Sequence, residues 1–239
     1  MQKVLVITPT YNEAENISDF LMSVLEITAT NLDFTVDVLV VDGNSPDGTA
    51  EIVKNLAASN PRIHLLVEQK KEGLGKAYGK GFRQGLDQGY DLLIEMDADF
   101  SHDPIYLPEM LTLSKQADLV IGSRYVKGGG TTDWGVFRRL ISKGASFYTR
   151  FVTGLVVHDV TGGFKCFKRA VLETIPFDKV QAFGYGFQIE MNYRVWKAGF
   201  KIIEFPIIFP DRRKGVSKFN KKIFWEAFWL VWKLRYGAD

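Results

Sequence analysis

Two aspartates, Asp97 and Asp99, are separated by one residue and directly follow the apolar segment 92–96. Two carboxylates this close together at the end of a strand can jointly hold a hard divalent cation. Mg²⁺ usually takes one or two carboxylates and completes its octahedron with water and substrate phosphates. Such a cation would neutralise the charge of a departing nucleotide diphosphate. The alternative is a solvated turn, but the position after an apolar strand favours the metal site.

Two further polar clusters also follow apolar runs. Asp42 comes directly after the run 38–41, where its carboxylate can accept hydrogen bonds from a base or a ribose. Helix capping is the alternative role for Asp42, although Asp47 is better placed for it. Pro9 and Tyr11 follow the first apolar run. We expect them to wall a base pocket, with Tyr11 stacking on the base.

A glycine- and lysine-rich segment, residues 70–80, invites comparison with a phosphate-binding loop. Its glycine and lysine spacing does not match the Walker pattern, no Ser or Thr follows the lysine, and the motif G-x-G-x-x-G is absent. We expect this segment to begin a helix whose glycines allow close packing on the sheet, with at most a minor role near phosphate.

The elements that must position these residues alternate along the chain. Short apolar runs predict strands, and amphipathic stretches between them predict helices. The strands are expected at 4–8, 36–41, 63–67, 92–96 and 119–121, and the helices at 14–28, 49–58, 76–88 and 105–115. Farther along, a helix is expected near 135–153, a strand near 164–167, a helix near 187–198 and strands within 201–209. This order predicts an α/β fold with a mostly parallel sheet, whose ligand site lies at the carboxyl ends of the strands.

Length and composition exclude several classes of protein. The 239 residues suit one α/β domain, and the formal net charge of +2 argues against nucleic acid as a partner. One cysteine and three widely spaced histidines argue against a disulfide framework or a zinc centre. There is no run of 18 apolar residues and no signal-peptide pattern at the first residues. We therefore expect an intracellular domain without a membrane span.

Four motifs occur in the order and at the spacing typical of one enzyme family. They are Pro9-Thr10-Tyr11-Asn12-Glu13, the segment 40–49, Asp97-Ala98-Asp99 and Gly122-Ser123-Arg124-Tyr125. With residues 140–145 and Arg212 and Lys218, they resemble the family 2 glycosyltransferases of the GT-A (Rossmann-like) fold. More narrowly, residues 3–220 resemble the polyprenyl-phosphate (dolichyl-phosphate) mannosyltransferases.

The resemblance implies a donor, an acceptor and a metal. The donor would be GDP-mannose, the acceptor a polyprenyl (dolichyl) monophosphate, and the metal Mg²⁺ or Mn²⁺ held by Asp97 and Asp99. The residues that it implies for the donor are Pro9, Tyr11, Glu13, Asp42, the backbone at Ala98, and Arg212 and Lys218 over the diphosphate. The chain departs from many relatives at Gly43, where they have a second aspartate, and at Ser101, where some have a glutamine ligand.

A lipid phosphate is a different acceptor from a sugar hydroxyl. A phosphate monoester is already anionic at neutral pH, with a second pKa of about 6, so it needs cations that position it and no general base. Arg124 ends a predicted strand, and Arg138 precedes Ser142 by one helical turn, so both project from one helix face. The resemblance assigns these three residues to the acceptor phosphate and implies that Arg124 is catalytic together with Asp97 and Asp99. It also implies direct inversion at the sugar carbon.

The end of the chain has a composition of its own. Residues 212–222 hold six basic and no acidic residues, and residues 223–232 hold three of the five tryptophans. At helical spacing, Trp225, Trp229, Trp232 and Tyr236 form one stripe. The run has about half of the roughly 20 apolar residues that a membrane span needs. We therefore expect a catalytic domain over 1–220 and an amphipathic helix over 221–239 that lies on a membrane surface.

Alternatives remain open on three points. The C-terminal helix could instead dock on the protein core or on a small membrane-embedded subunit. The enzyme could be a UDP-glucose-dependent polyprenyl-phosphate glucosyltransferase, because the sugar pocket cannot be deduced from the sequence. A catalytically silent relative that only binds nucleotide is the third alternative, and the intact aspartates and arginines favour the enzyme. The main hypothesis, a mannosyltransferase with an interfacial C-terminal helix, places the protein in the cytoplasm, peripheral on the cytosolic face of a membrane.

Overall fold

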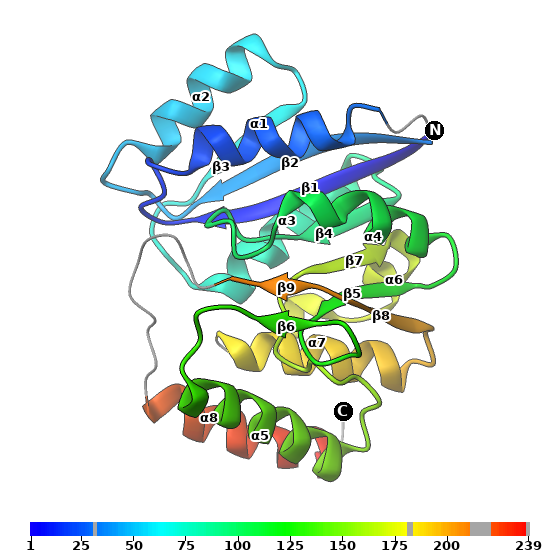
Figure 1. Cartoon of the computed structure of the whole chain (residues 1–239). Coiled ribbons are helices and arrows are strands. Elements are labelled where there is room, and N and C mark those ends of the chain that lie inside the picture. The colour runs from blue at the N-terminus through cyan, green and yellow to red at the C-terminus, as the bar shows by residue number, and fades with distance from the viewer. Residues whose placement is uncertain (31–32, 181–183, 211–220, 238–239) are drawn as a thin grey trace.

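The computed structural model describes residues 1–30, 33–180, 184–210 and 221–237, and for 221–227 it describes the backbone alone. Its centre is a seven-stranded sheet in the order β3-β2-β1-β4-β7-β5-β8 (Figure 1). The strands are β1 (Gln2–Thr10), β2 (Phe34–Asp42), β3 (Ile63–Val67), β4 (Leu92–Glu95), β5 (Leu119–Ser123), β7 (Lys165–Lys168) and β8 (Ile202–Pro206). Only β7 runs antiparallel to its neighbours in this sheet, so the predicted, mostly parallel α/β fold is confirmed.

Helices cover both faces of the sheet. One face packs against α1 (Ile17–Thr28), α2 (Thr49–Ser59) and α4 (Leu107–Ser114), and the other against α3 (Leu74–Asp87), α6 (Arg169–Thr174) and α7 (Tyr185–Lys197). Alternate residues of β1 reach the two cores: Val4 and Val6 lie in the first, and Leu5 and Ile7 in the second. This alternation is the two-residue period of a strand that is buried on both faces. Two 3₁₀ turns, η1 (Pro104–Tyr106) and η2 (Phe177–Lys179), complete the loops.

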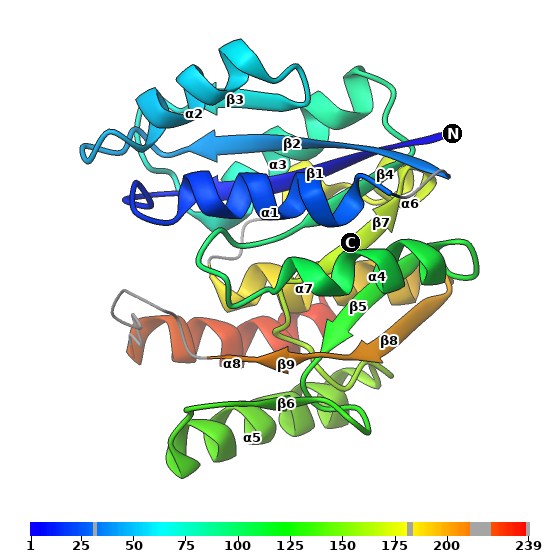
Figure 2. The same cartoon turned by 45° about the horizontal axis from the view of Figure 1, so that its top comes forward.

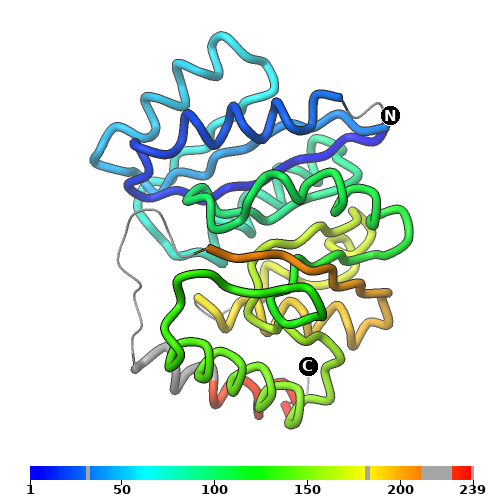
Figure 3. The backbone as a smooth tube through the Cα atoms, viewed as in Figure 1, coloured from blue at the N-terminus to red at the C-terminus, as the bar shows by residue number. Residues whose placement is uncertain are grey.

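A second, two-stranded sheet modifies the predicted C-terminal half. The segment 201–209, expected to be strand-like, divides into β8 and β9 (Ile208–Phe209). The strand β9 leaves the main sheet and pairs with β6 (Gly130–Thr131), which lies in a glycine-rich loop with no apolar run to mark it. The backbone trace shows that the first half of the chain builds one end of the main sheet and the second half the other (Figure 3).

The predicted C-terminal helix is present and packs on the rest of the chain. This helix, α8 (Lys221–Tyr236), lies against α5 (Val136–Thr153) and α7 (Figures 1 and 2). Val231 is fully buried in the core shared with α3 and α7. Tyr148 of α5 stacks on Phe228 and accepts a 2.7 Å hydrogen bond from Trp232 Nε1. Among the described residues, no helix combines the length and apolarity needed to cross a membrane.

Helix α3 begins within the segment 70–80, as predicted, but the two glycines that let it lie close to the sheet, Gly81 and Gly85, follow that segment. A Cβ atom added to Gly81 would lie 2.4 Å from Cγ2 of Ile7, and one added to Gly85 would lie 2.5 Å from Cδ2 of Leu93. Both distances are too short for carbon atoms in van der Waals contact. The helix could therefore not keep this position against β1 and β4 with larger residues at 81 and 85.

This packing predicts opposite effects for two glycines of the same helix. We expect Gly81→Ala to lower the free energy of unfolding by about 1–2 kcal/mol, because overpacking outweighs the better helix propensity of alanine. Gly79 has no atom within 4 Å of an added Cβ, so Gly79→Ala should raise the free energy of unfolding by up to about 1 kcal/mol. Urea unfolding of both variants measures this difference, and equal shifts would contradict the close packing of α3.

Candidate active site

The carboxyl ends of β1, β2, β4 and β5 lie at one edge of the sheet (Figure 1). The polar clusters of the sequence motifs directly follow these strand ends. Thr10 and Asp42 end neighbouring strands in register. The hydroxyl of Thr10 donates a 2.8 Å hydrogen bond to Asp42 Oδ2. The parallel order of the strands thus brings together the residues that the sequence motifs singled out.

Asp42 is fully buried, and its carboxylate is held by the protein itself. Besides the bond from Thr10, it accepts hydrogen bonds from the backbone N–H (2.8 Å) and the hydroxyl (2.6 Å) of Ser45. Asp42 therefore ties the ends of β1 and β2 together. Asp47 accepts hydrogen bonds from the backbone N–H and hydroxyl of Thr49 at the start of α2, which is the helix-end position expected for it. Contact of Asp42 with a nucleotide stays a prediction.

The other residues predicted for the donor line the same edge. Tyr11 is exposed, and Nζ of Lys71 lies 3.7 Å from the centre of its ring, a cation–π contact. Glu13 accepts a hydrogen bond from Asn16 and donates its backbone N–H to Thr49. Pro9, in the last residues of β1, is partly exposed. Lys71 was not predicted individually, although it belongs to the lysine-rich segment that was considered near phosphate.

The two candidate metal ligands lie in the loop that follows β4. Oδ1 of Asp97 accepts a hydrogen bond of 3.2 Å from Tyr78 Oη, and the backbone N–H of Asp97 donates to Nδ1 of His102. Asp99 is buried, and its Oδ1 accepts from the backbone N–H (3.0 Å) and hydroxyl (2.5 Å) of Ser101. Each carboxylate thus has one oxygen held by a neighbouring hydroxyl, which fixes its orientation.

These residues fit a divalent cation of the magnesium type. Within the described part of the chain, no three His, Cys, Asp or Glu side chains gather to hold a metal by themselves. Two carboxylates with the remaining ligands from diphosphate and water are the usual arrangement for Mg²⁺. Ser101 is turned toward Asp99, and Ala98 is buried in the core, so that its side chain is not available to a donor. The roles of Asp97 and Asp99 as ligands stay predictions.

Buried ionisable groups lie directly beneath this loop. Tyr78 is fully buried, and burial together with the charge of Asp97 raises the pKa of its phenol well above the usual value, so it stays a hydrogen-bond donor. Glu95 and Lys165 are opposite each other on β4 and β7, and both are fully buried. Burial raises the pKa of Glu95 to about 7 and lowers that of Lys165 to about 8. Lys165 also donates to the side chain of Gln188. No motif of the sequence points to this buried group.

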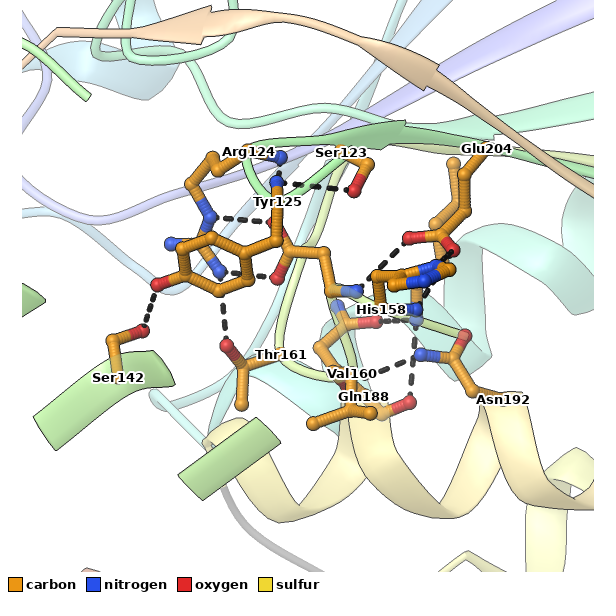
Figure 4. A network of polar contacts seen from close by, with 12 residues as sticks. Ser123, Arg124, Tyr125, Ser142, His158, Val160, Thr161, Gln188, Asn192 and Glu204 are labelled. Atoms are coloured by element: carbon orange, nitrogen blue, oxygen red, sulfur yellow. Dashed lines mark hydrogen bonds and ion pairs between the residues drawn. The ribbon is translucent and has the colours of Figure 1, made fainter. Parts of the chain in front are cut away.

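Arg124 is only 7% exposed, and Asp159 already pairs with it. Its Nε and Nη2 donate to the two carboxylate oxygens of Asp159 at 2.7 and 2.6 Å, and its backbone N–H donates to the same residue. Figure 4 shows a further bond from Nη2 to the hydroxyl of Thr161, of 2.9 Å. Asp159 therefore neutralises most of the charge of Arg124, the arginine that the resemblance assigned to the acceptor phosphate. Contact of Arg124 with the acceptor phosphate stays a prediction.

The loop that carries Asp159 is fastened by other elements. Glu204 of β8 accepts the backbone N–H groups of His158 (2.7 Å) and Asp159 (2.9 Å). Asn192 of α7 donates to the carbonyl oxygen of Val160 at 3.1 Å (Figure 4). These contacts hold Asp159 in place, and through it the guanidinium of Arg124.

Arg138 and Ser142 lie on α5, as predicted, and face the end of β5. The guanidinium carbon of Arg138 lies 3.9 Å from the ring centre of Trp134, and that of Arg124 lies 5.4 Å from the same ring. Tyr125, next to Arg124, donates a 2.6 Å hydrogen bond to the hydroxyl of Ser142 (Figure 4). The three residues predicted for the acceptor are therefore brought together. Arg212 and Lys218 lie outside the described residues.

Known proteins resemble this chain in sequence and in fold. Glycosyl transferase family 2 matches residues 5–176. The undecaprenyl-phosphate mannosyltransferase of Micrococcus luteus is 44% identical over 94% of this chain and 90% of its own length. The polyprenol monophosphomannose synthase of Mycolicibacterium smegmatis is 43% identical over 100% of this chain and 89% of its own length.

Two solved structures show the same fold at low sequence identity. The glucosyl-3-phosphoglycerate synthase of Mycobacterium tuberculosis, in complex with Mg²⁺ and UDP, has a TM-score of 0.70 and 17% identity over 100% of this chain and 81% of its own. The mannosyltransferase PcManGT of Pyrobaculum calidifontis, in complex with GDP-Man and Mn²⁺, has a TM-score of 0.58 and 22% identity. That match covers 92% of this chain and spans 59% of the length of the other protein. The motifs, the fold and the relatives agree: the chain belongs to glycosyl transferase family 2.

Proposed function

We propose that the protein transfers mannose from GDP-mannose to a polyprenyl phosphate. An oxygen of the acceptor phosphate bonds to the anomeric carbon, the bond from that carbon to the diphosphate breaks, and GDP leaves. The observation that carries the proposal is the pair of relatives, more than 40% identical over nearly the whole chain, whose names specify mannosyl transfer to such lipids. The groups at the end of β5 and on α5 have the chemistry that a phosphate acceptor needs.

The acceptor side offers cations and hydroxyls. Arg138 is a cation on α5, Ser142 presents a hydroxyl whose oxygen already accepts from Tyr125, and Arg124 lies beneath them. A buried carboxylate beside them, that of Asp159, is bound to Arg124 through both oxygens and so cannot serve as a free general base. A sugar hydroxyl would need such a base, but a phosphate is already anionic at neutral pH.

The donor side has the complementary chemistry. Asp97 and Asp99 would hold Mg²⁺ or Mn²⁺, which would neutralise the negative charge that develops on the diphosphate as GDP leaves. Tyr11 has an exposed ring, on which a guanine base can stack. Arg212 and Lys218 would act on the same diphosphate. The loops after β1, β2 and β4 would thus bind the donor, and the β5–α5 side the acceptor.

The proposed reaction is tested with a panel of donors. The purified protein receives a polyprenyl phosphate, Mg²⁺ or Mn²⁺, and either GDP-mannose or UDP-glucose, and mass spectrometry identifies the lipid product. We expect mannosylated lipid phosphate from GDP-mannose, and none from the Asp99→Ala variant, whose thermal unfolding should stay cooperative. Glucosylated lipid from UDP-glucose alone would instead establish the glucosyltransferase, and the absence of any product would contradict the enzyme.

Arg138 should matter for the acceptor more than for the donor. A lost hydrogen bond to a charged group costs about 1.5–3 kcal/mol, so Arg138→Ala should raise KM for the lipid phosphate by roughly 10- to 100-fold. KM for GDP-mannose should change little. Arg139→Ala is the matched control, because Arg139 is the adjacent arginine of α5 and its Nε donates to the carbonyl oxygen of Trp134. Equal effects of both variants on the lipid would refute a specific phosphate contact by Arg138.

We also propose that α5 and α8 place the enzyme on a membrane surface. Exposed apolar and aromatic side chains of these two helices form a surface that we call the lipid face. It consists of Phe137, Leu140, Phe147 and Phe151 of α5 and Trp229, Trp232 and Tyr236 of α8. The four α5 side chains are 64–80% exposed and are spaced by three, seven and four residues, which puts them on one side of the helix. Basic residues of α5 flank them, and such a helix binds anionic membranes. Ser142 and Arg138 lie on the side of the same helix that faces the end of β5, so the acceptor phosphate would be held one helix diameter, roughly 10 Å, from the lipid face.

Point substitutions test the lipid face better than truncation does, because removal of α8 would also remove the buried Val231. The double variant Phe147→Ser/Phe151→Ser should bind anionic liposomes at least about tenfold more weakly, since each phenylalanine contributes roughly 1.5–3 kcal/mol when buried. The control is Met22→Ser/Val67→Ser, which removes two half-exposed apolar side chains from α1 and β3. Co-sedimentation measures both, and equal binding by the two double variants would exclude α5 as a membrane contact.

A further inference from the structure

Tyr78 connects helix α3 with the loop of Asp97 and Asp99. Its side chain is fully buried, and its ring stacks between Phe187 (6.1 Å between ring centres, planes 8° apart) and Phe82 (6.2 Å, 23°). From this position its hydroxyl donates the 3.2 Å hydrogen bond to Oδ1 of Asp97. A tyrosine from the core thus reaches a carboxylate at the carboxyl edge of the sheet.

The reach of Tyr78 depends on the close packing of α3. Gly81 and Gly85, which follow Tyr78 on this helix, allow its axis to approach β1 and β4. Gly75, one turn before it, faces Phe187, where an added Cβ would lie 2.8 Å from the ring. The helix contacts β1, β2 and β4. The close packing of α3 on the sheet and on Phe187 therefore fixes where the Tyr78 ring lies, and with it the position of the Tyr78 hydroxyl.

The alternative is that the hydrogen bond to Asp97 only gives the buried hydroxyl of Tyr78 a partner and has no effect on the loop. The identity of its partner argues against this alternative, because Asp97 is a carboxylate at the surface edge rather than a group of the core. Ligating carboxylates are themselves held by hydrogen bonds from a surrounding shell, which orients them and raises metal affinity. The contacts of Ser101 and His102 hold the loop from within. Tyr78 holds it from a separate element, which fixes the loop relative to the sheet.

We propose that Tyr78 is a positioning residue that orients the Asp97 carboxylate toward the divalent cation of the donor diphosphate. The proposal rests on the metal role of Asp97 and Asp99 in the proposed function. It does not depend on which lipid is the acceptor. Because Tyr78 acts through Asp97, its loss should weaken metal binding and leave the chemical step intact once metal is bound.

The test compares two tyrosines that donate to aspartates. Tyr78→Phe removes the hydroxyl and keeps the ring between its neighbours. Tyr90→Phe is the matched control, because Tyr90 Oη donates to Asp37 Oδ2 at 2.7 Å and Asp37 lies in β2, away from the strand ends that carry the site. Electron paramagnetic resonance measures Mn²⁺ binding to each full-length variant in the presence of GDP and without any acceptor.

We expect Tyr78→Phe to weaken Mn²⁺ binding about tenfold or more, which is the usual effect of losing an outer-shell partner. Tyr90→Phe should bind Mn²⁺ like the unchanged protein. Sugar transfer by Tyr78→Phe should recover its full kcat at high Mn²⁺, with only the Mn²⁺ requirement raised. Thermal unfolding should remain cooperative in both variants, because the buried ring is retained.

Several results would overturn the proposal. Unchanged Mn²⁺ affinity in Tyr78→Phe, or equal weakening in both variants, would show that the hydroxyl does not position Asp97. A kcat that stays low at saturating Mn²⁺ would also contradict a pure positioning role. Failure of the proposed function would give a different result. The unchanged protein would bind Mn²⁺ with GDP and Tyr78→Phe would bind it more weakly, but neither would transfer mannose. That result would support the role of Tyr78 and refute the proposed mannose transfer.

Discussion

The parallel order of β1, β2, β4 and β5 is the constraint on which the site depends, because it brings four strand ends to one edge of the sheet. A nucleotide and a metal need carboxylates and an aromatic surface, whereas a phosphate needs cations. The first set follows β1, β2 and β4, and the second follows β5 and continues on α5. One antiparallel strand, β7, lies between β4 and β5 and separates the two sets by one strand. The sheet thus places groups of opposite charge side by side.

Buried charged groups lie beneath this edge of the sheet, and their role is to fix the positions of the loops that carry them. Removing two charges from water costs several kcal/mol per ion, which hydrogen bonds must offset. Arg124 and Asp159 meet this condition through two side-chain bonds and a backbone bond, and Glu204 fixes the loop of Asp159. Glu95 and Lys165 form a second buried pair below the loop of Asp97 and Asp99, close enough for each to affect the pKa of the other. The first pair restricts how this edge of the sheet can be arranged, because it joins the end of β5 to the loop of Asp159.

The sequence predicted the strand ends well because each apolar run stops at a polar cluster, as at Asp42 and Asp97. It also predicted α5 and the common face of Arg138 and Ser142. It did not predict the partner of Arg124, since Asp159 is 35 residues away and only the folded chain brings the two together. The target of the Tyr78 hydroxyl was hidden for the same reason. The two-residue strand β6 and the six-residue helix α6 are too short for any periodic pattern.

The central claim is that a metal–nucleotide site and a lipid-phosphate site meet at this one edge. Phosphorus NMR of a short-chain polyprenyl phosphate tests it directly, with the protein and GDP present and either Mn²⁺ or Mg²⁺ added. Paramagnetic Mn²⁺ at Asp97 and Asp99 should strongly broaden the signal of the acceptor phosphate, whereas diamagnetic Mg²⁺ should leave it sharp. A lipid phosphate that binds the protein but shows the same line width with both ions would contradict the account, because its binding site would then lie far from the metal.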